Sequence, residues 1–532
     1  MKKPLIVLIG ILLPLAGFSQ VSGPVNPAMD KFNTIRQNGV STIAAFGDTI
    51  WISPSMNRNI NNEAFWFTPV NADSVTDGIG RVFSLDLAQD TIVAGLGFTA
   101  SSPDGNVAAG YGFYFSTDGG ENWRFSPFPT DPQPSEECQS NNSGYNPECD
   151  ISFIYGGETY YRVRNTVREQ SPPYSIQLHG EKVFAATWAS GLIRSLDFGE
   201  TWERIILPPT SVTDFNPNNS YEWVSQVSSG TVLRYDPRFD NNLLGFGVLI
   251  DSRNRVWFGS AGGINISENA LTAPTDSISW KHISFNNTSN GLLANWIISI
   301  KEEPGTGRIW MTNWIADQPQ KEGIVYTEDG GETFTQMLIG ERINDIGFKD
   351  GYVFAAGNNG FFISAGGGST WIKSPQIKSP NTFIKPSAAF YSVASTSDRV
   401  WIGTEDGIAS TSDYGKTWEI TRVNFPLKGG NIHDPDGRNV NTYAYPNPFS
   451  NSVHELVRIK FEVENQSNVK VRVFDFGMNL VREIENSSFA SGTYEAIWDG
   501  YDGKGRKVAN GAYIYVIEKG DEQVSGKILV VD

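Results

Sequence analysis

Carboxylates are the most abundant side chains of this sequence that could do chemistry, with 58 Asp and Glu residues against four His. Two carboxylates that face each other across a groove can hydrolyse a glycosidic bond, one as acid and the other as base or nucleophile. Asp236 and Asp240 lie together in one long predicted loop. Acidic residues are so frequent that no pair stands out, and no residue is assigned a catalytic role.

Other catalytic arrangements have no counterpart in the sequence. There is no Gly-x-Ser-x-Gly nucleophile motif, no glycine-rich phosphate loop and no His placed for a triad. His179 precedes a predicted turn, where a solvated surface role is expected. The two cysteines are too few, and the four histidines too widely spaced, to predict a metal site. Nothing in the sequence predicts a cofactor.

Aromatic rings and arginines near the ends of predicted strands are candidates for ligand contacts. Flat rings stack on the apolar faces of sugars and suit extended peptides. Trp296, Trp314, Tyr391 and Arg162 are the preferred contacts, the three rings because they lie at or beside a strand end. For each ring, packing of a long loop onto the protein body is the alternative.

The chain begins with Met1-Lys2-Lys3, an apolar stretch over residues 5–18, and the small residue Ser19. This pattern predicts a signal peptide over residues 1–19 and an exported protein, secreted or at the cell surface. The apolar stretch is too short for a membrane span, and no later segment reaches that length.

The formal net charge of −17 and a pI of about 4.8 predict repulsion of phosphate backbones and anionic membranes. We expect no nucleic-acid partner, and we expect a monomer. Cys138 and Cys149 lie close together in a polar segment. In an oxidising compartment we expect them to pair and close a surface loop, with a stabilisation of about 2–3 kcal/mol.

A short pattern, Ser/Thr-x-Asp-x-Gly-x-Thr-Trp, recurs five times. It is nearly complete at 116–123, 195–202 and 411–418, ends in Phe334 at 327–334, and carries Gly366 in place of Asp at 364–371. Asp followed by Gly favours a tight turn. A structural role is expected for Asp118, Trp123, Asp197, Trp202, Asp329, Asp413 and Trp418.

The pattern resembles the Asp-box, or BNR, repeat of sialidases, xyloglucan-cleaving hydrolases, sortilin-type receptors and photosystem assembly factors. The resemblance covers most of the chain. It implies a β-propeller in which each repeat joins the third and fourth strands of a blade, away from the ligand. The early Arg-Ile-Pro signature of sialidases is absent, and the xyloglucan-cleaving enzymes typically have two propellers, where this chain has one.

A second element, an apolar run that closes on a small residue, predicts a buried strand in each unit. It occurs seven times, at 50–53, 92–95, 183–186, 256–259, 309–312, 353–356 and 400–403. Residues 267–280 are a candidate decayed copy of the turn pattern. Seven units of about 55 residues predict a seven-bladed β-propeller over residues 20–425.

A separate small β domain is predicted over residues 441–532, after a linker at 426–440. Its Tyr445-Pro446-Asn447-Pro448-Phe449 and its 498–505 segment resemble the FlgD-type Ig-like domain, related tails of which end substrates of type IX secretion. The resemblance implies sorting, anchoring or spacing, with export machinery as the partner. The fold class is therefore all-β, a propeller followed by an Ig-like β-sandwich.

The lengths of the predicted loops indicate which end of the propeller is functional. In a four-stranded meander, turns after strands one and three lie at one end, and those after strands two and four at the other. The first set is short, and the second holds the long insertions 54–63, 96–109, 128–173, 207–242, 313–321 and 373–386. Long loops gathered on a rigid scaffold are typical of binding sites.

The sequence therefore predicts a non-catalytic module that binds a glycan or an extracellular protein or peptide at the long-loop end. Two alternatives remain open. One is a glycoside hydrolase, sialidase-like or xyloglucanase-like, that uses carboxylates at that end. The other is a scaffold or assembly factor for another exported protein, because propeller loops also accept peptides.

Overall fold

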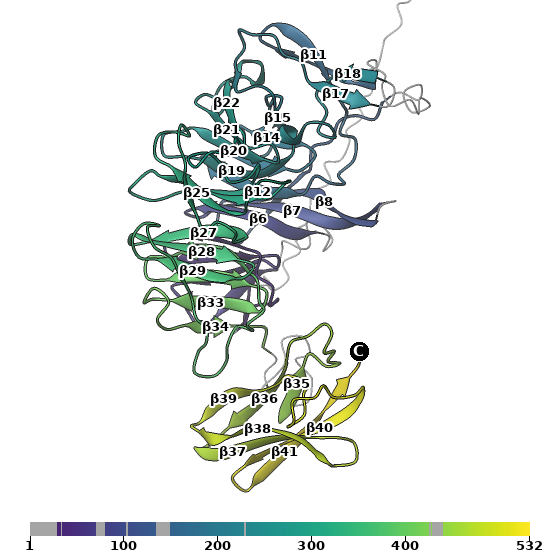
Figure 1. Ribbon diagram of the computed structural model, residues 1–532, viewed down its shortest axis with the longest axis vertical. Coiled ribbons are helices and arrows are strands. Elements are labelled where there is room, and N and C mark those ends of the chain that lie inside the picture. Colours follow the sequence, from purple (N-terminus) through teal and green to yellow (C-terminus); the bar gives the residue numbers. More distant parts are fainter. Residues whose placement is uncertain are drawn as a thin grey trace, which may run out of the picture.

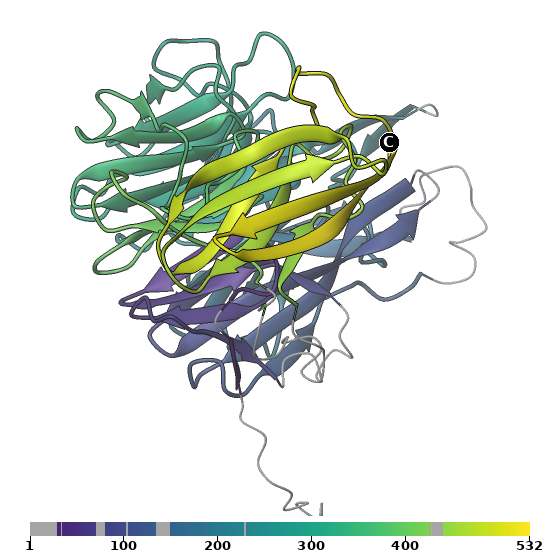
Figure 2. The same cartoon turned by 90° about the horizontal axis from the view of Figure 1, so that it is seen from below.

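A computed structural model describes residues 29–32, 34–70, 80–102, 105–134, 149–227, 230–424, 427 and 440–532. The predicted signal peptide, Cys138 and all but two residues of the predicted linker lie outside these ranges. The described chain forms a large ring of sheets and a smaller sandwich, which lies beside the sheet that holds β33 and β34 (Figure 1). Seen from below, the sandwich lies in front of the ring (Figure 2).

Seven antiparallel sheets, each containing a meander of four strands, follow one another in the ring. Sheets one to three hold β2 (Thr42–Phe46), β3 (Thr49–Ser53), β4 (Asn57–Ile60), β5 (Trp66–Pro69); β6 (Arg81–Ala88), β7 (Thr91–Ser102), β8 (Gly105–Ser116), β9 (Arg124–Pro127); β12 (Pro173–His179), β13 (Lys182–Thr187), β14 (Gly191–Ser195) and β15 (Glu203–Arg204). The first sheet gains a fifth strand, β1 (Met29–Phe32), beside β5.

Sheets four to seven repeat this order. They hold β19 (Gly245–Ile250), β20 (Val256–Ser260), β21 (Ile264–Ser267), β22 (Trp280–Ile283); β23 (Trp296–Glu302), β24 (Ile309–Trp314), β25 (Gly323–Thr327), β26 (Thr335–Met337); β27 (Ile343–Lys349), β28 (Tyr352–Gly357), β29 (Gly360–Ser364), β30 (Ile372–Lys373); β31 (Phe390–Ser395), β32 (Val400–Thr404), β33 (Gly407–Thr411) and β34 (Glu419–Thr421). β16 (Asp214–Phe215) pairs with β22.

The first strand of each sheet contacts the first strand of the next, and β31 of sheet seven contacts β2 of sheet one. This closed ring confirms the predicted all-β, propeller-like fold. The second strands β20 and β32 are buried along their whole length, and β13 at every residue except Lys182, because neighbouring sheets cover both of their faces. Their sequences are continuous apolar runs for that reason.

Each repeated turn joins a third strand to a fourth and is held by its own side chains. Asp197 accepts hydrogen bonds from Ser195 Oγ at 2.8 Å and from the Thr201 backbone N–H at 2.8 Å. Ser195 Oγ in turn accepts the Gly199 N–H at 2.7 Å. The same bonds recur in the turns at 116–123, 327–334 and 411–418. The Asp carboxylates of these turns therefore accept hydrogen bonds from residues of the same turn and have a structural role.

The candidate decayed copy keeps this hydrogen bonding in an expanded form. Ser267 Oγ accepts the Ala270 N–H at 2.9 Å, and Asn269 replaces the Asp. Asn269 Oδ1 accepts the N–H of Ser279, ten residues further on, at 2.9 Å. Trp280 follows and donates its indole N–H to the Ile206 carbonyl at 3.0 Å. An insertion therefore lengthened this turn and left its two ends in place.

The glycine at the fifth position of each repeated turn presses against the preceding sheet. Gly199 has φ +81°, and a Cβ there would lie 2.2 Å from the Phe115 ring of sheet two. At the other four turns the distance to an atom of the preceding sheet would be 2.5–2.8 Å, for Gly120, Gly331, Gly368 and Gly415. Only a residue without a side chain fits. The repeat is therefore a contact between sheets as well as a turn.

Among the residues that the structure describes, the ring closes without exchange of strands between its ends. Residues 34–40 run along sheet seven, where the Val40 N–H donates to the Thr404 carbonyl at 2.9 Å and the Gly407 N–H to the Asn38 carbonyl at 2.7 Å. Trp66 of sheet one meets Trp401 of sheet seven edge to face, with ring centroids 6.2 Å apart. Sheet one is built from N-terminal residues alone.

Two insertions on either side of sheet three form a lobe, defined by the hairpins β10 (Ile151–Tyr155) with β11 (Glu158–Arg162) and β17 (Val224–Val227) with β18 (Gly230–Leu233). The lobe is at the top of Figure 1. Its core joins that of sheets three and four through Tyr155, Phe215, Trp223 and Tyr235. Two 3₁₀ turns, Asn241–Leu243 and Thr275–Ser277, interrupt the strands.

The C-terminal domain is a sandwich of two sheets. One holds β35 (Thr442–Tyr445), β36 (Val457–Val463) and β39 (Gly492–Trp498). The other holds β38 (Leu480–Phe489), β37 (Ser467–Phe474), β40 (Gly511–Lys519) and β41 (Glu522–Val530). Alternate residues of β36 and β37 enter a core around the fully buried Trp498. Within the described ranges, no helix is long and apolar enough to cross a membrane.

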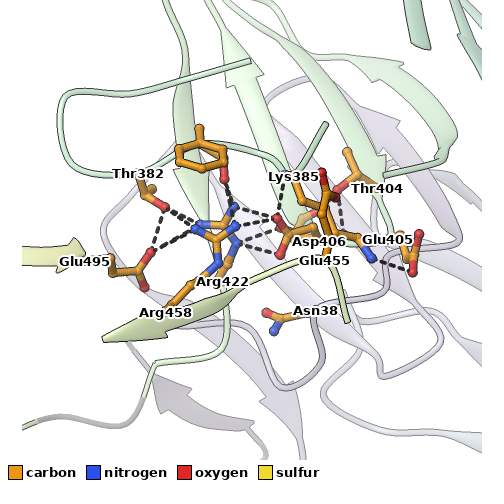
Figure 3. A network of polar contacts seen from close by, with 12 residues as sticks. Asn38, Thr382, Lys385, Thr404, Glu405, Asp406, Arg422, Glu455, Arg458 and Glu495 are labelled. Atoms are coloured by element: carbon orange, nitrogen blue, oxygen red, sulfur yellow. Dashed lines mark hydrogen bonds and ion pairs between the residues drawn. The ribbon is translucent and has the colours of Figure 1, made fainter. Parts of the chain in front are cut away.

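An ion network joins the sandwich to sheet seven (Figure 3). Asp406 Oδ2 accepts Nη2 of Arg422 at 3.0 Å and Nη2 of Arg458 at 2.8 Å. Glu495 Oε2 accepts Arg458 Nη1 at 3.3 Å and the Thr382 hydroxyl at 2.8 Å. Arg458 and Glu495 belong to the sandwich, and the other three residues belong to the ring. The Arg422 and Arg458 side chains are only 5% and 3% exposed, so each buried guanidinium charge is stabilised by the carboxylates of Asp406 and Glu495.

We expect Gly199→Ala to destabilise the ring more than Gly180→Ala. Gly180 has a similar φ, +62°, but a Cβ there would meet nothing within 4 Å. The control should therefore lose only the cost of positive φ, about 1–2 kcal/mol. Overpacking against Phe115 should add about 1–3 kcal/mol to the loss for Gly199→Ala. Urea unfolding measures both, and equal losses would contradict the contact between sheets.

We expect Arg458→Ala to release the sandwich from the ring. The substitution leaves Asp406 and Glu495 undercompensated at a buried interface, a loss of about 3–5 kcal/mol. Small-angle X-ray scattering should show a larger radius of gyration. Arg472→Ala, which removes an ion pair with Glu518 on the other sheet of the sandwich, is the control and should leave the scattering unchanged.

Candidate functional site

The first strands of the seven sheets surround a central channel of about 1030 Å³. Each of these strands starts at the end where the chain passes from one sheet to the next. The long connections between sheets, such as 128–172 and 205–244, are at this end, which we call the mouth. The turns between first and second strands, at the opposite end, are two to six residues long.

The register of the first strands shifts near their mouth ends. In sheets two, three, four, six and seven the shift leaves one residue out of the pairing, and in sheet five it leaves two. A β-bulge of this kind changes the direction of the side chain on the extra residue. The extra residues are Phe83, Tyr174, Phe246, Ile298 with Ser299, Asn344 and Tyr391. All except Phe246 line the channel.

Three of these bulges begin a continuous aromatic band. Phe83 lies 6.3 Å from Tyr174, and Tyr174 lies 5.9 Å from Phe246, between ring centroids. Phe246 contacts Trp188 at 4.9 Å and Trp296 at 5.3 Å. The aromatic band therefore runs across sheets two to five at the mouth. Its rings are half-buried or, for Tyr174, exposed, so they present apolar faces to solvent.

Trp314, on β24 of sheet five, links the mouth to sheet six. It is the register partner of Trp296, and its indole N–H donates to the Ile343 carbonyl at 2.7 Å. The Arg342 guanidinium lies 3.8 Å from the centre of its ring, a cation–π contact. Tyr391 lines the channel from sheet seven, and burial together with Glu405 raises its pKa.

Below the mouth, the charged side chains of the channel are paired with protein groups. Lys301 Nζ lies 2.8 Å from Asp345 Oδ2 and 3.0 Å from the Val393 carbonyl oxygen. Asp345 also accepts the Ser299 hydroxyl at 2.9 Å. This network links the first strands of sheets five, six and seven, so the charges support the wall.

Asp86 makes a second link, between sheets two and three. Its carboxylate accepts the Gln177 side-chain N–H at 2.8 Å and the Leu178 and Leu87 backbone N–H groups at 2.7 and 2.9 Å. Burial outweighs these bonds and raises the pKa of Asp86 to about 6. Both oxygens accept hydrogen bonds from the wall.

Of the residues proposed from sequence, the structure places Trp296, Trp314 and Tyr391 at the mouth. Arg162 lies elsewhere: it is in the lobe, where its two Nη atoms bind Asp131 at 2.6 and 2.8 Å. Cys138 lies outside the described residues, so its pairing with Cys149 stays a prediction. The aromatic side chains of Tyr155 and Trp223 are buried and pack in the core of the lobe, so they are not available to a ligand at the mouth.

The carboxylates considered for hydrolysis do not form a pair across a groove. Asp236 binds Arg234 and Arg238, at 2.8 and 2.7 Å. Asp240 accepts the N–H groups of Thr210 and Asn242 and caps a 3₁₀ turn. Among the described residues, no group of three or more His, Cys, Asp or Glu side chains could hold a metal ion.

Sequence reasoning missed Phe83, Tyr174, Trp188 and Phe246. A usable signal existed for three of them. In Val82-Phe83-Ser84, Pro173-Tyr174-Ser175, Gly245-Phe246-Gly247 and Phe390-Tyr391-Ser392, an aromatic residue precedes a small one just before an alternating run. The bulge itself breaks the alternation by one residue, and so it hid the position from a strand pattern with period two.

Comparison with known families identifies the sandwich. Residues 451–523 match the FlgD Ig-like domain. No curated protein sequence matches this chain.

Several solved structures are similar at low identity. PorZ, an essential bacterial surface component of the type-IX secretion system of Porphyromonas gingivalis, is 12% identical over 93% of this chain and 82% of its own, with TM-score 0.34. YCF48 from Cyanidioschyzon merolae is 15% identical over 72% and 97%, with TM-score 0.41. An ancestral GH74 enzyme is 13% identical over 95% and 63%, with TM-score 0.45. At these values nothing about activity or ligands carries over.

We expect the stability of the protein to depend on the ionisation of Asp86. A carboxyl group with a pKa of 3.8 when unfolded and about 6 when folded favours folding in its protonated form. Its contribution is fully present below about pH 4 and is lost as the pH rises through 6, by about 3 kcal/mol.

Asp86→Asn should remove this dependence. The difference in unfolding free energy between the native protein and the variant, measured by urea unfolding from pH 4 to pH 7, should therefore change between pH 4 and pH 6 and level off above about pH 6. A difference that stays constant over this range would show that Asp86 does not ionise in the wall as described.

Proposed function

We propose that this chain is an exported, non-catalytic binding protein whose ligand, a glycan or an extended peptide of an extracellular protein, binds at the channel mouth. The aromatic band carries the proposal. Aromatic side chains from four neighbouring sheets form one continuous surface. The β-bulges set the direction of three of them, Phe83, Tyr174 and Phe246. Such a surface suits the apolar faces of successive sugar rings or the side chains of an extended peptide.

Three further observations support this reading. The charges of the channel wall below the mouth are paired with protein groups, and Arg81 at the mouth lies 4.9 Å over the Phe83 ring, so stacking and hydrogen bonding at the mouth are the main means of recognition. The sequence begins with a signal-peptide pattern over residues 1–19. The repeated turns, with an Asp in four of the five and a glycine at the fifth position in all, fit the Asp-box kind of propeller, whose turns serve the scaffold. We further propose that the sandwich connects the protein to export machinery or to the cell surface.

A glycoside hydrolase is the second candidate, and one observation favours it. Asp86 lines the channel with a pKa of about 6, near the range of a general acid, and Asp345 lines the same channel. Against this, both carboxylates accept hydrogen bonds from the wall. Reducing-sugar release from polysaccharides, lost in Asp86→Asn, would establish the hydrolase and contradict our proposal.

We expect Trp296→Ala and Tyr391→Ala each to weaken binding at the mouth at least tenfold, equivalent to about 1.4 kcal/mol. Glycan arrays and immobilised peptide libraries identify the ligand, and titration calorimetry then compares the variants. Tyr161→Ala is the control, because Tyr161 lies on β11 of the lobe and is 43% exposed. A ligand whose affinity falls in the control and not in the mouth variants would move the site to the lobe.

A further inference from the structure

The lobe contains a second cavity, separate from the central channel, of about 720 Å³. One wall is the hairpin β10–β11, and the opposite walls are the end of sheet three and the 3₁₀ turn at 275–277. Ile151, Phe153, Ile205 and Ile206 give it apolar surface. Its volume is typical of cavities that hold small organic ligands. None of the channel residues lines it.

Two arginines in the wall share one carboxylate. Arg162 binds Asp131 with both Nη atoms, and Arg204 Nη1 binds the same carboxylate at 3.2 Å. Glu203, also in the wall, is neutralised by the fully buried Arg194, with Nε 2.7 Å from its Oε1. Among the described residues, two guanidinium groups therefore share the single carboxylate of Asp131. Burial and the nearby Arg162 accordingly lower the pKa of Arg204.

Hydrogen-bonding capacity is left over at the same place. Arg204 makes a single hydrogen bond, and its Nε has no partner among the described residues. The Tyr235 side chain is 6% exposed, and its hydroxyl proton finds no acceptor in the described part of the chain. Both of these atoms are themselves buried, so a ligand in the cavity would reach Arg204 through the exposed part of its side chain. The Arg204 side chain is 15% exposed and lines the cavity.

We propose that this cavity binds an amphipathic organic acid, with its carboxylate at Arg204 and its apolar body against Ile151, Phe153 and Ile206. A carboxylate would give the two arginines a second negative charge beside that of Asp131, and arginine binds carboxylates by paired hydrogen bonds. The site is independent of the channel mouth and of the function proposed for it.

Asp276, in the wall of the same cavity, provides a second and opposite test of the proposal. It lies in the wall on the 3₁₀ turn, and its Oδ1 accepts only the neighbouring Ser277 hydroxyl, at 2.7 Å, within the described structure. Its negative charge opposes an anionic ligand in the same cavity. Removal of this charge should therefore strengthen binding of an acid, whereas loss of Arg204 should weaken it. The two substitutions act in opposite directions on one measurement.

N-acetylphenylalanine and its uncharged amide are the probes, titrated by calorimetry into the full mature chain at pH 7. The acid should bind at least tenfold more tightly than the amide. Arg204→Gln should weaken binding of the acid at least tenfold, and Asp276→Asn should strengthen it two- to fivefold. Trp296→Ala, at the channel mouth, is the control and should leave both affinities unchanged.

Equal binding of acid and amide, or no binding of either, would overturn the proposal. An unchanged affinity in Arg204→Gln would do the same. If Arg204→Gln fails to fold, as thermal unfolding would show, Asp276→Asn decides alone: a gain for the acid with none for the amide supports the site, and no gain refutes it. Loss of binding in Trp296→Ala would assign the acid to the channel instead.

Discussion

The contact between each repeated turn and the sheet before it is the constraint on which the rest of the structure depends. A glycine at each of five turns lets the backbone reach the apolar side chains of the preceding sheet. The spacing of neighbouring sheets is set at these points, and the first strands then surround a channel. The mouth, the bulges and the aromatic band are all consequences of this spacing, because they need neighbouring first strands side by side.

Residues that mark local structure were predictable from sequence, and residues that act at a distance were not. The turns around Asp118, Asp197 and Asp413 and the buried second strands follow from nearest-neighbour chemistry, and so does the sandwich from its strand alternation. Trp296, Trp314 and Tyr391 could be proposed because they lie at strand ends. The role of Arg162 depends on Asp131, 31 residues earlier, and only the fold brings the two together.

The two polar sites described here use charge in different ways. Along the channel, Asp86 and Asp345 join neighbouring first strands, and each is surrounded by donors from the wall. In the lobe, the arginines outnumber the carboxylate between them. A fully paired network stiffens its surroundings, whereas an underpaired one is free to bind a ligand. For this reason we propose that aromatic side chains recognise the ligand at the channel mouth and that arginine side chains recognise it in the lobe cavity.

The closure of the ring by residues 34–40, without a borrowed strand, bears on how the molecule assembles. Every sheet of the ring is made of contiguous chain, so a polypeptide that emerges N-terminus first could complete one sheet after another. The last sheet then needs only to dock against a surface that is already finished. A ring that shared a strand between its two ends would have to hold its first sheet incomplete until the last sheet had been synthesised.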